Sequence, residues 1–272
     1  MEVLQKLSDD KIRQEIYDSS DDGLAVSEAE YWENFYDDGD FVYEWNRGYL
    51  ELKPLSTVGA GRLYQWFLTA LSYYFDTFPA GQLITLNIGF RVALPEGVSI
   101  RRPDLAMVLY SNPDAIADDD CVYKGTFDLC VESLSYFSQK EIERDTVVKK
   151  SEYEGIGVKE YYILDAREKE TVFYRLNPGG KYEKIRPDRG IIRSGILPGF
   201  QFRVSDLYRQ PPPEEMAEDR VYYKYFLPFY QRGMLHAERH RAEEAEELLI
   251  MERQRSAHLV AKLRELGIFP DA

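Results

Sequence analysis

The sequence predicts an α/β fold, with a mixed sheet flanked by helices and a helical extension at its C-terminal end. Apolar residues recur at steps of three and four in two segments, β-prone runs surround these segments, and a proline-rich break precedes a helical tail. The chain has 272 residues, of which 44% are hydrophobic, so it can bury one sizeable core and still carry an appendage.

The first half of the chain combines a hairpin, a helix and several strands. An acidic stretch over residues 1–40 contains Asp-rich turns and comes before the first β-prone run. In chain order the expected elements are a hairpin over 41–54 with its turn at Asn46–Gly48, a helix capped by Ser56 or Thr57 and ending near Pro79, and strands at 83–94, 105–110 and 127–131.

The second half of the domain adds a helix, a strand and another hairpin. Ser138 and Glu141 form a capping-box pattern at the start of the helix, and Gly155 and Gly157 end it. The expected elements are the helix over about 139–154, a strand at 160–165, and a hairpin of 171–176 and 181–185 across the turn 177–180. This order predicts helices packed on a mixed sheet.

The run Gln210–Pro213 marks the expected domain boundary. It separates a domain over residues 1–209, with its core at about 30–209, from a helical extension over 210–272, in which Pro228 predicts a break or kink. Glu252 and Ser256 interrupt an imperfect coiled-coil seam in this extension, whose apolar members are Leu235, Ala242, Ala245, Leu249, Leu259, Leu263 and Leu266. We expect such a helix either to fold back on the core or to pair with another copy, which favours a homodimer.

The charge balance and the cysteine content narrow the functional classes. The chain carries 34 Lys and Arg against 48 Asp and Glu, a formal net charge of −14, which argues against broad phosphate binding but leaves room for a locally basic groove. Cys121 and Cys130 do not indicate a disulfide framework, so a reducing, cytoplasmic location is the simpler interpretation. We expect neither a transmembrane helix nor a signal peptide.

The positions of the three histidines disfavour several mechanisms. His236, His240 and His258 all lie in the C-terminal extension, so the domain lacks a histidine base and a histidine-rich zinc site. His236 and His240 are four residues apart and could share a metal, but a solvated helix face is the expected role. Neither GxxxxGK[ST] nor GxGxxG occurs, so the common phosphate-binding loops are absent.

Carboxylates and lysines therefore remain as candidate functional residues. Asp104 follows Pro103 at the start of a predicted strand, and Glu132 follows the apolar run Leu129–Val131. Taken singly, Asp104 could cap a turn and Glu132 could face solvent. If their strands lie side by side, the two acids could hold a hard cation such as Mg²⁺ or Mn²⁺, which keeps waters for a phosphate group.

Lys149 lies on the predicted helix that follows Glu132, on the same face as Asp145 and Tyr153. A lysine there could orient or deprotonate a water and offset the charge that grows on a phosphate. The alternative role is a surface lysine, and Lys150 is an equally available competitor. Two acids followed by a lysine predict metal-assisted hydrolysis of a phosphodiester.

Several motifs of the chain form a combination. They are the hairpin Tyr43–Leu50, Pro103-Asp104, Glu132-Ser133-Leu134-Ser135, Arg144-Asp145 with Lys149 and Tyr153, the segment Gly157–Asp165, Leu197-Pro198-Gly199-Phe200, and Lys262–Ile268. Together they resemble the Uma-two family of restriction-endonuclease-like proteins, within the PD-(D/E)XK nuclease superfamily, and the likeness covers roughly residues 30–210 and the end of the tail.

The resemblance implies a restriction-endonuclease-like core in which Asp104 and Glu132 correspond to the metal-binding acids. Lys149 would correspond to a helix lysine that replaces the strand lysine of the E-x-K motif, because the residue two after Glu132 is Leu134. The sequence also has Val58–Gly61 where many members carry a histidine. Glu51 is a candidate additional acid, although an exposed strand glutamate is the expected role.

Two functions compete on these observations. The favoured one is a metal-dependent, endonuclease-like hydrolase that acts on DNA or another nucleic acid, with Asp104, Glu132 and Lys149 as catalytic residues and Mg²⁺ or Mn²⁺ as cofactor. The alternative is a catalytically weak or silent nuclease-fold interaction protein that assembles through its C-terminal helix. The acidic net charge, the missing E-x-K lysine and the coil seam favour the alternative.

Overall fold

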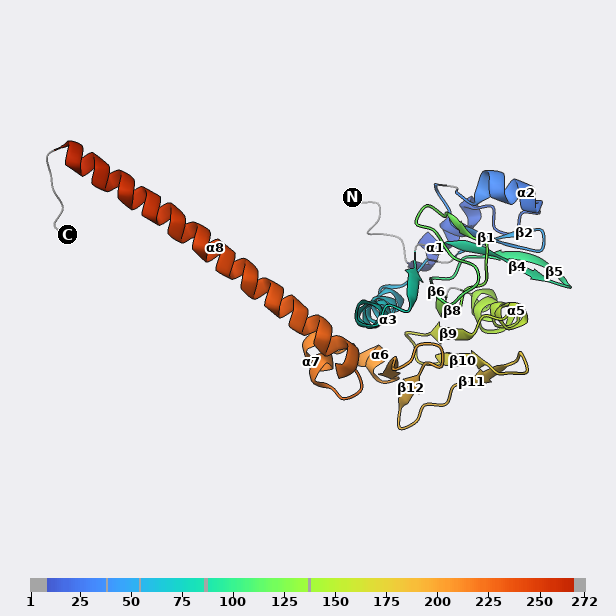
Figure 1. The fold of residues 1–272 in the computed structure, drawn as a ribbon. Coiled ribbons are helices and arrows are strands. Elements are labelled where there is room, and N and C mark those ends of the chain that lie inside the picture. The colour runs from blue at the N-terminus through green and yellow to red at the C-terminus, as the bar shows by residue number, and fades with distance from the viewer. Residues whose placement is uncertain (1–8, 38, 54, 86–87, 137, 267–272) are drawn as a thin grey trace.

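Two main sheets with helices between and beside them form the body of the protein, and one long helix projects from it (Figure 1). The predicted α/β class is confirmed, including the mixed sheet, the flanking helices and the C-terminal helical extension. The computed structural model describes residues 9–37, 39–53, 55–85, 88–136 and 138–266.

The first sheet has five strands in the order β2-β1-β5-β4-β7. Its hairpin turn uses Arg47 and Gly48, whose φ angles of 50° and 101° are both left-handed, as the tightest hairpin turns require. The elements of this part are α1 (Asp9–Ser19), α2 (Glu28–Glu30), the π-helix η1 (Tyr31–Phe35), β1 (Tyr43–Asn46), β2 (Tyr49–Leu52), β4 (Gly89–Leu94), β5 (Gly97–Arg101) and β7 (Val122–Tyr123).

The second sheet has six strands in the order β11-β10-β9-β8-β6-β3, and only β8 and β9 run parallel within it. A parallel pair needs a crossover connection, and here a helix with a π-helical middle turn provides it. The strands are β3 (Gly81–Ile84), β6 (Leu105–Leu109), β8 (Leu129–Ser133), β9 (Glu160–Leu164), β10 (Val172–Leu176) and β11 (Tyr182–Lys184), and the crossover comprises α4 (Gln139–Glu143), the π-helix η2 (Arg144–Lys149) and α5 (Lys150–Ile156).

The crossover begins and ends at the residues that the sequence indicates. The Ser138 side chain accepts a hydrogen bond from the Glu141 N–H, and Gly157 ends the helix with a left-handed φ of 88°. Its middle turn is a π-helix, which the apolar spacing did not reveal. The wider turn buries Arg144, Asp145 and Lys149 together.

The six-stranded sheet is covered on both faces. Helix α3 (Val58–Thr77), capped by Thr57, packs on one face through Leu63, Phe67 and Tyr74. Helix α5 packs on the other face, where Tyr153 shares a cluster with Phe90 of the five-stranded sheet. The crossover helix therefore lies between the two sheets.

Two local expectations differ from the structure. The strand expected over 83–94 is split, because β3 joins the six-stranded sheet and β4 joins the five-stranded one. Leu86 and Asn87, between these strands, lie outside the described residues. The same holds for Gly267 and Ile268 of the tail motif and for the side chain of His236. Pro228 does not break the last helix, since it is only the sixth residue there and removes one hydrogen bond near the N-terminus.

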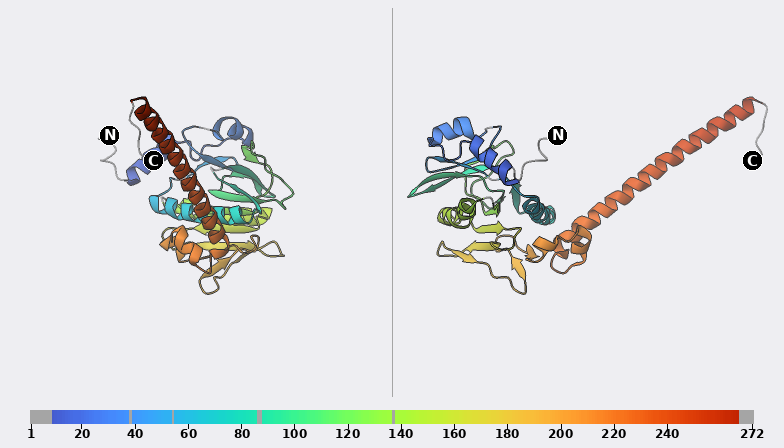
Figure 2. Two further views of the ribbon diagram at one scale, coloured as in Figure 1. Left: turned by 60° about the vertical axis from the view of Figure 1, so that its left-hand side comes forward. Right: turned by 180° about the vertical axis from the view of Figure 1, so that it is seen from behind.

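The C-terminal part first completes the body and then leaves it (Figure 2). Its elements are the hairpin β12 (Ile191–Arg193) and β13 (Gln201–Arg203), then α6 (Asp206–Arg209), α7 (Pro213–Glu218) and α8 (Tyr223–Glu265). Met216, Tyr222 and Phe226 belong to the same core cluster as Phe67 of α3. Among the described helices, none is long and apolar enough to cross a membrane.

Candidate active site

The structure brings Asp104 and Glu132 side by side. Strands β6 and β8 are antiparallel with Leu105 opposite Val131, which places Asp104, just before β6, opposite Glu132. Directly opposed residues point to the same face of a sheet with their Cβ atoms about 5 Å apart. Two acids that are 28 positions apart in the sequence therefore flank one point on the sheet.

Lys149 reaches the same point from the crossover helix. Its Nζ lies 3.0 Å from Glu132 Oε1, 3.0 Å from Glu44 Oε1 and 3.1 Å from Asp145 Oδ1. Lys150 faces elsewhere, with its Nζ 5.2 Å from the centre of the Tyr174 ring. Of the two competing lysines, Lys149 is therefore the one beside the acids.

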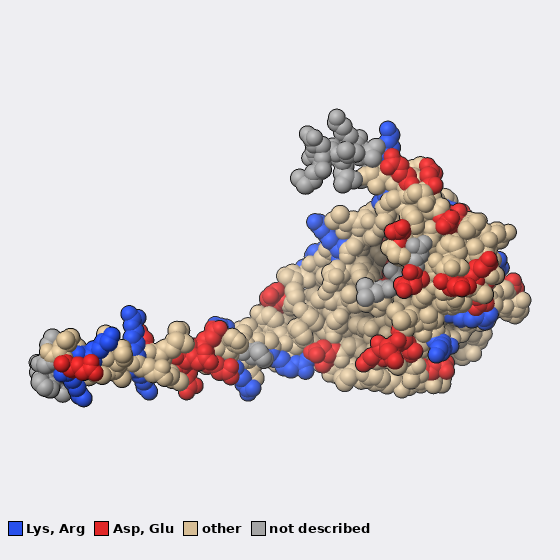
Figure 3. Space-filling model, turned by 90° about the horizontal axis from the view of Figure 1, so that it is seen from above, with Lys and Arg blue, Asp and Glu red and all other residues tan. Residues whose placement is uncertain are grey.

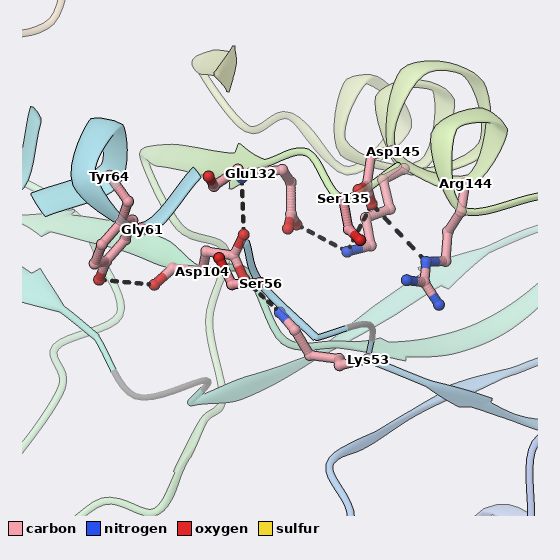
Figure 4. Close-up of a pocket in the computed structure, with 11 residues that line it drawn as sticks. Lys53, Ser56, Gly61, Tyr64, Asp104, Glu132, Ser135, Arg144 and Asp145 are labelled. Atoms are coloured by element: carbon pink, nitrogen blue, oxygen red, sulfur yellow. Dashed lines mark hydrogen bonds and ion pairs between the residues drawn. The ribbon is translucent and has the colours of Figure 1, made fainter. Parts of the chain in front are cut away.

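A cavity of about 320 Å³ opens over these side chains (Figure 4). The end of β8, the loop before α3, the first turns of α3 and the π-helix η2 supply its walls. Its lining consists of Lys53, Ser56, Gly61, Tyr64, Asp104, Glu132, Ser133, Ser135, Arg144, Asp145 and Lys149. The three expected site residues thus share one pocket.

Asp104 is held by two donors. Lys53 Nζ lies 2.8 Å from its Oδ1, and the Ser133 N–H donates to its Oδ2 at 2.8 Å. Burial alone would raise the pKa of Asp104, but the charges of Lys53 and Lys149 and the Ser133 N–H outweigh burial and leave that pKa below its usual value. Asp104 is thus kept as a carboxylate in the pocket.

Glu132 differs from Asp104 in that its pKa is raised. Its Oε1 accepts hydrogen bonds from Lys149 and, at 3.1 Å, from the Tyr153 hydroxyl. Burial raises the pKa of Glu132 to about 8, and the nearby carboxylates of Asp104 and Asp145 add to this against the opposing lysine charges. Glu132 is therefore the pocket acid that gains most from an added cation.

Lys149 and Glu44 stabilise each other's charged forms. Burial disfavours the charge of Lys149, yet Asp145, Glu132 and Glu44 outweigh it and raise the pKa of Lys149 above its usual value. Burial likewise opposes the charge of Glu44, but Lys149 and Arg101 lower the pKa of Glu44 far below its usual value. Lys149 is accordingly a fixed cation, and it is poorly suited to accept a proton.

A second layer of charges lies behind the pocket. The fully buried Arg101 pairs with Glu44 at 3.2 Å, Glu51 at 2.6 Å and Glu152 at 2.6 Å. Glu51 thus contacts Arg101 and does not line the pocket, and its side chain is only 14% exposed, in contrast to the exposed strand glutamate expected. Arg101 holds these acids in place behind Lys149.

The ion-paired network has more acids than cations. Five carboxylates are joined to three basic side chains, which are Glu44, Glu51, Glu132, Asp145 and Glu152 against Arg101, Arg144 and Lys149, and Lys53 and Asp104 form a separate pair beside them. The excess is two negative charges only when Glu132 is ionised, and the raised pKa of Glu132 disfavours that form until a further cation is bound. A network that is largely buried cannot leave this excess uncompensated without cost.

The donor set fits a Mg²⁺ or Mn²⁺ ion that keeps several waters. Among the residues that the structure describes, no group of three or more His, Cys, Asp or Glu side chains is arranged to hold a metal ion. Mg²⁺ commonly binds through one or two carboxylates and water, and Asp104 and Glu132 offer such a pair. The acid excess around this pair favours the same ion.

Sequence reasoning missed two residues of the site. Glu44 is completely buried, and its position between Tyr43 and Trp45 gave the same signal that singled out Glu132. Lys53 has no such signal, because one lysine before a proline in a loop resembles any surface lysine. Its side chain is nevertheless only 10% exposed.

Comparisons with known proteins show the family and the fold of the chain. A solved structure of "a putative nuclease belonging to DUF820" from Anabaena variabilis ATCC 29413 superposes with a TM-score of 0.52 at 13% identity, over 66% of this chain and 96% of that one, which shows a shared fold. No curated protein matches the sequence. The family model Uma2, described as "Putative restriction endonuclease", matches residues 27–205. Because this match spans most of the chain and includes Asp104, Glu132 and Lys149, the protein belongs to the Uma2 family of restriction-endonuclease-like proteins.

Proposed function

We propose that this protein is a divalent-metal-dependent nuclease that hydrolyses phosphodiester bonds in DNA or another nucleic acid. The observation that carries the proposal is the convergence of Asp104 and Glu132, opposite each other on β6 and β8, with the ammonium group of Lys149 3.0 Å from Glu132. The family match and the nuclease-like fold support the same reaction class.

Asp104 and Glu132 would hold the metal, Mg²⁺ or Mn²⁺. When bound, such an ion supplies Lewis acidity to a phosphoryl oxygen and lowers the pKa of a bound water. Lys149 holds the Glu132 carboxyl in place and presents a positive charge where negative charge grows on the phosphate. In this proposal Lys149 acts as an electrostatic group that orients water, because its raised pKa disfavours a role as general base.

Other side chains prepare the pocket for an anionic substrate. Lys53 and Arg144 line it and carry positive charge, although the chain as a whole is acidic. The Tyr153 hydroxyl donates a hydrogen bond to Glu132 Oε1 and so restricts the side-chain rotamer of Glu132. The lining sets Lys53, Arg144 and Lys149 against Asp104, Glu132 and Asp145, so a bound divalent cation would be needed to make the pocket positive enough for a phosphate. The acidic surface around it disfavours nonspecific binding along a polymer.

The proposal is tested by cleavage assays on the purified full chain. Plasmid, linear duplex, single-stranded DNA and RNA are each incubated with Mg²⁺ or Mn²⁺. Asp104→Asn and Glu132→Gln should each lower the cleavage rate by at least about 100-fold. Glu160→Gln removes an equally buried carboxylate outside the pocket and should leave the rate within about threefold in a folded sample.

Two outcomes would refute the nuclease proposal. One is the absence of cleavage of every substrate by protein that binds Mn²⁺. The other is cleavage that Asp104→Asn leaves undiminished, since a contaminating enzyme would then account for it.

A second candidate function is a nuclease-fold interaction protein with little or no activity. The observation that favours it is that ammonium groups lie against both acids, Lys53 at Asp104 and Lys149 at Glu132. Calorimetric titration with Mn²⁺ distinguishes the two functions before any substrate is known. Failure to bind millimolar Mn²⁺ favours the interaction protein, whereas binding that Glu132→Gln abolishes favours the enzyme.

A further inference from the structure

Helix α8 leaves an apolar stripe without a partner in the single chain. Every side chain that the structure describes between Gln231 and Leu259 is exposed. The large exposed apolar residues from Gln231 to the end of α8 and its cap are Met234, Leu235, Leu248, Leu249, Ile250, Met251, Leu259 and Leu266, of which Leu235, Leu249, Leu259 and Leu266 share the stripe. This stripe lies beyond the Uma2 match, which ends at residue 205.

The stripe has the spacing of a two-helix seam. From Leu235 to Leu266, alternating steps of three and four run over 32 residues, about 48 Å and more than four heptads, with Glu238, Glu252 and Ser256 as polar interruptions. Exposed apolar rows of this length mark an association surface, because their burial requires a second helix. A fold-back onto the body is not what the structure shows, since α8 points away from it (Figure 2).

The helix has an acidic part with basic side chains on both sides of it (Figure 3). The acidic part is Glu243, Glu244, Glu246 and Glu247. The basic part is Arg253, Arg255, Lys262 and Arg264. The apolar run Leu248–Met251 separates these two parts, so the charges that directly flank this run are complementary when the helix is reversed on itself.

We propose that α8 pairs with α8 of a second copy of this chain in antiparallel orientation, centred close to Leu248–Met251. Registering the seam on itself in reverse sets Leu235 against Leu266, and Ala242 against Leu259. The acidic part of each helix then lies along the basic part of the other, with Glu246 near Arg253 of the second copy. Opposite charges beside a seam choose partner and orientation in this way.

The parallel arrangement is disfavoured by the same residues. In register, it sets Glu238 against Glu238 and Glu252 against Glu252 inside the seam, and it lays the acidic part along itself. Like charges at such positions oppose association. In the antiparallel register Arg241 lies near Lys262 of the second copy, a like-charge contact that opposes this pairing, whereas Arg239 lies near Val260.

The first experiment tests assembly with a matched pair of substitutions. Leu249 and Ile250 are neighbours and equally exposed at 48%, but only Leu249 lies on the seam. By analytical ultracentrifugation the full chain should be a dimer at micromolar concentration, and Leu249→Glu should raise the dissociation constant at least about 100-fold. Ile250→Glu should change it by less than about fivefold. A monomeric full chain, a larger assembly, or equal effects of the two substitutions would overturn the proposal.

The second experiment tests orientation. In a Cys121→Ser background, Ala242→Cys and Leu259→Cys proteins are treated with a short bis-maleimide, alone and mixed. The antiparallel seam predicts cross-linking in the mixture and little in either sample alone, because identical positions lie about 25 Å apart along the pair. Efficient cross-linking of the Ala242→Cys protein with itself would show a parallel pair and overturn the proposal. Circular dichroism checks that each variant keeps its helix content.

Discussion

At the scale of single residues, the pocket depends on where ammonium groups stand relative to carboxylates. Lys149 shares its charge among three acids, whereas Lys53 contacts one, Asp104. A buried lysine with three carboxylate partners cannot move without leaving them uncompensated. Lys53 has only one carboxylate partner among the described residues, which makes it the pocket cation that a metal ion displaces most readily from its acid.

We predict that Lys53→Met tightens Mn²⁺ binding by about tenfold, or about 1.4 kcal/mol, because it removes a competitor from Asp104 and one positive charge from the site. Isothermal titration calorimetry on the full chain measures this. Lys140→Met is the control, since Lys140 pairs with Asp22 outside the pocket and is 67% exposed, and it should leave the affinity unchanged. Weaker binding by the Lys53 variant would mean that this lysine organises the site.

Asp165 supplies a pH-dependent part of the stability. It accepts N–H groups from the three residues Arg167, Lys169 and Glu170, together with the Tyr136 hydroxyl. Burial would raise its pKa, but these donors outweigh burial and lower the pKa of Asp165 below its unfolded value of about 3.9. Its stabilising contribution is therefore complete above that unfolded value and disappears as the pH falls through the lower folded value.

Asp165→Asn should accordingly lower the free energy of unfolding by about 1–3 kcal/mol at pH 7. The difference from the unsubstituted chain should shrink as the pH is lowered below about 4. Urea unfolding at pH 7, 5, 4 and 3 measures it, with the exposed Asp188→Asn as control. A penalty that stays constant across this range would contradict the assignment to the ionised carboxylate.

At the scale of elements, the crossover between the parallel strands β8 and β9 positions the site. Its C-terminal cap, Gly157, has a left-handed φ of 88°, and a Cβ there would meet no other atom within 4 Å. Any cost of a side chain at this position is therefore a backbone cost. Gly59, in the first turn of α3, lacks the left-handed angle, and a Cβ there would make only an ordinary contact at 3.7 Å with Ala166.

Gly157→Ala should therefore destabilise the fold by about 1 kcal/mol. Gly59→Ala should stabilise it by about 0.4–1 kcal/mol, because it lowers the entropy of the unfolded chain and improves helix propensity. Thermal unfolding monitored by circular dichroism gives both signs in one series. The same sign for both substitutions would contradict the assignment of the Gly157 cost to its left-handed backbone angle.

The sequence predicted the elements that local patterns encode. Ser138, Gly157 and the hairpin turn at Arg47–Gly48 stand where caps and turns were expected, because each acts within a few residues. The π-turn at η2 was not predictable, since it depends on how the helix docks between two sheets. The split of the expected strand over 83–94 likewise depends on which sheet each half joins.

The candidate site was predictable to the same degree. Asp104 and Glu132 stood out because acids in apolar runs are costly, but only the antiparallel register of β6 and β8 brings them together. Glu44 carried the same signal on another strand. Lys53 enters the pocket through the path of its loop, which no local pattern records.

At the scale of the whole molecule, the body extends past the boundary that the proline run indicates. Helix α7 and the first turns of α8 bury Met216, Tyr222, Tyr225 and Phe226 in the core shared with α3. Each such side chain contributes roughly 1.5–3 kcal/mol through burial, so the four approach the total stability of a typical domain. We propose that the folded unit runs to about residue 230 and that the rest of α8 is the extension.

Two truncations test this boundary. A chain that ends at Arg232 should unfold within a few degrees of the full chain, because it keeps these aromatic contacts. A chain that ends at Arg209 should be largely unfolded or aggregated. Circular dichroism and thermal unfolding compare them, and a stable, cooperative fold in the shorter chain would restore the boundary at residue 209.

The protruding helix α8 also sets a spacing. From the body to the middle of the proposed helix pair is about 20 residues, or 30 Å, so the two bodies, each with its candidate pocket, would be held at opposite ends of a rod of about 60 Å. A polymer bound weakly by one pocket is then held at a high effective concentration near the second pocket, so the dimer binds it more tightly than either pocket alone. An acidic protein gains from such an arrangement, because holding a long polyanion at two points does not require a basic surface in between.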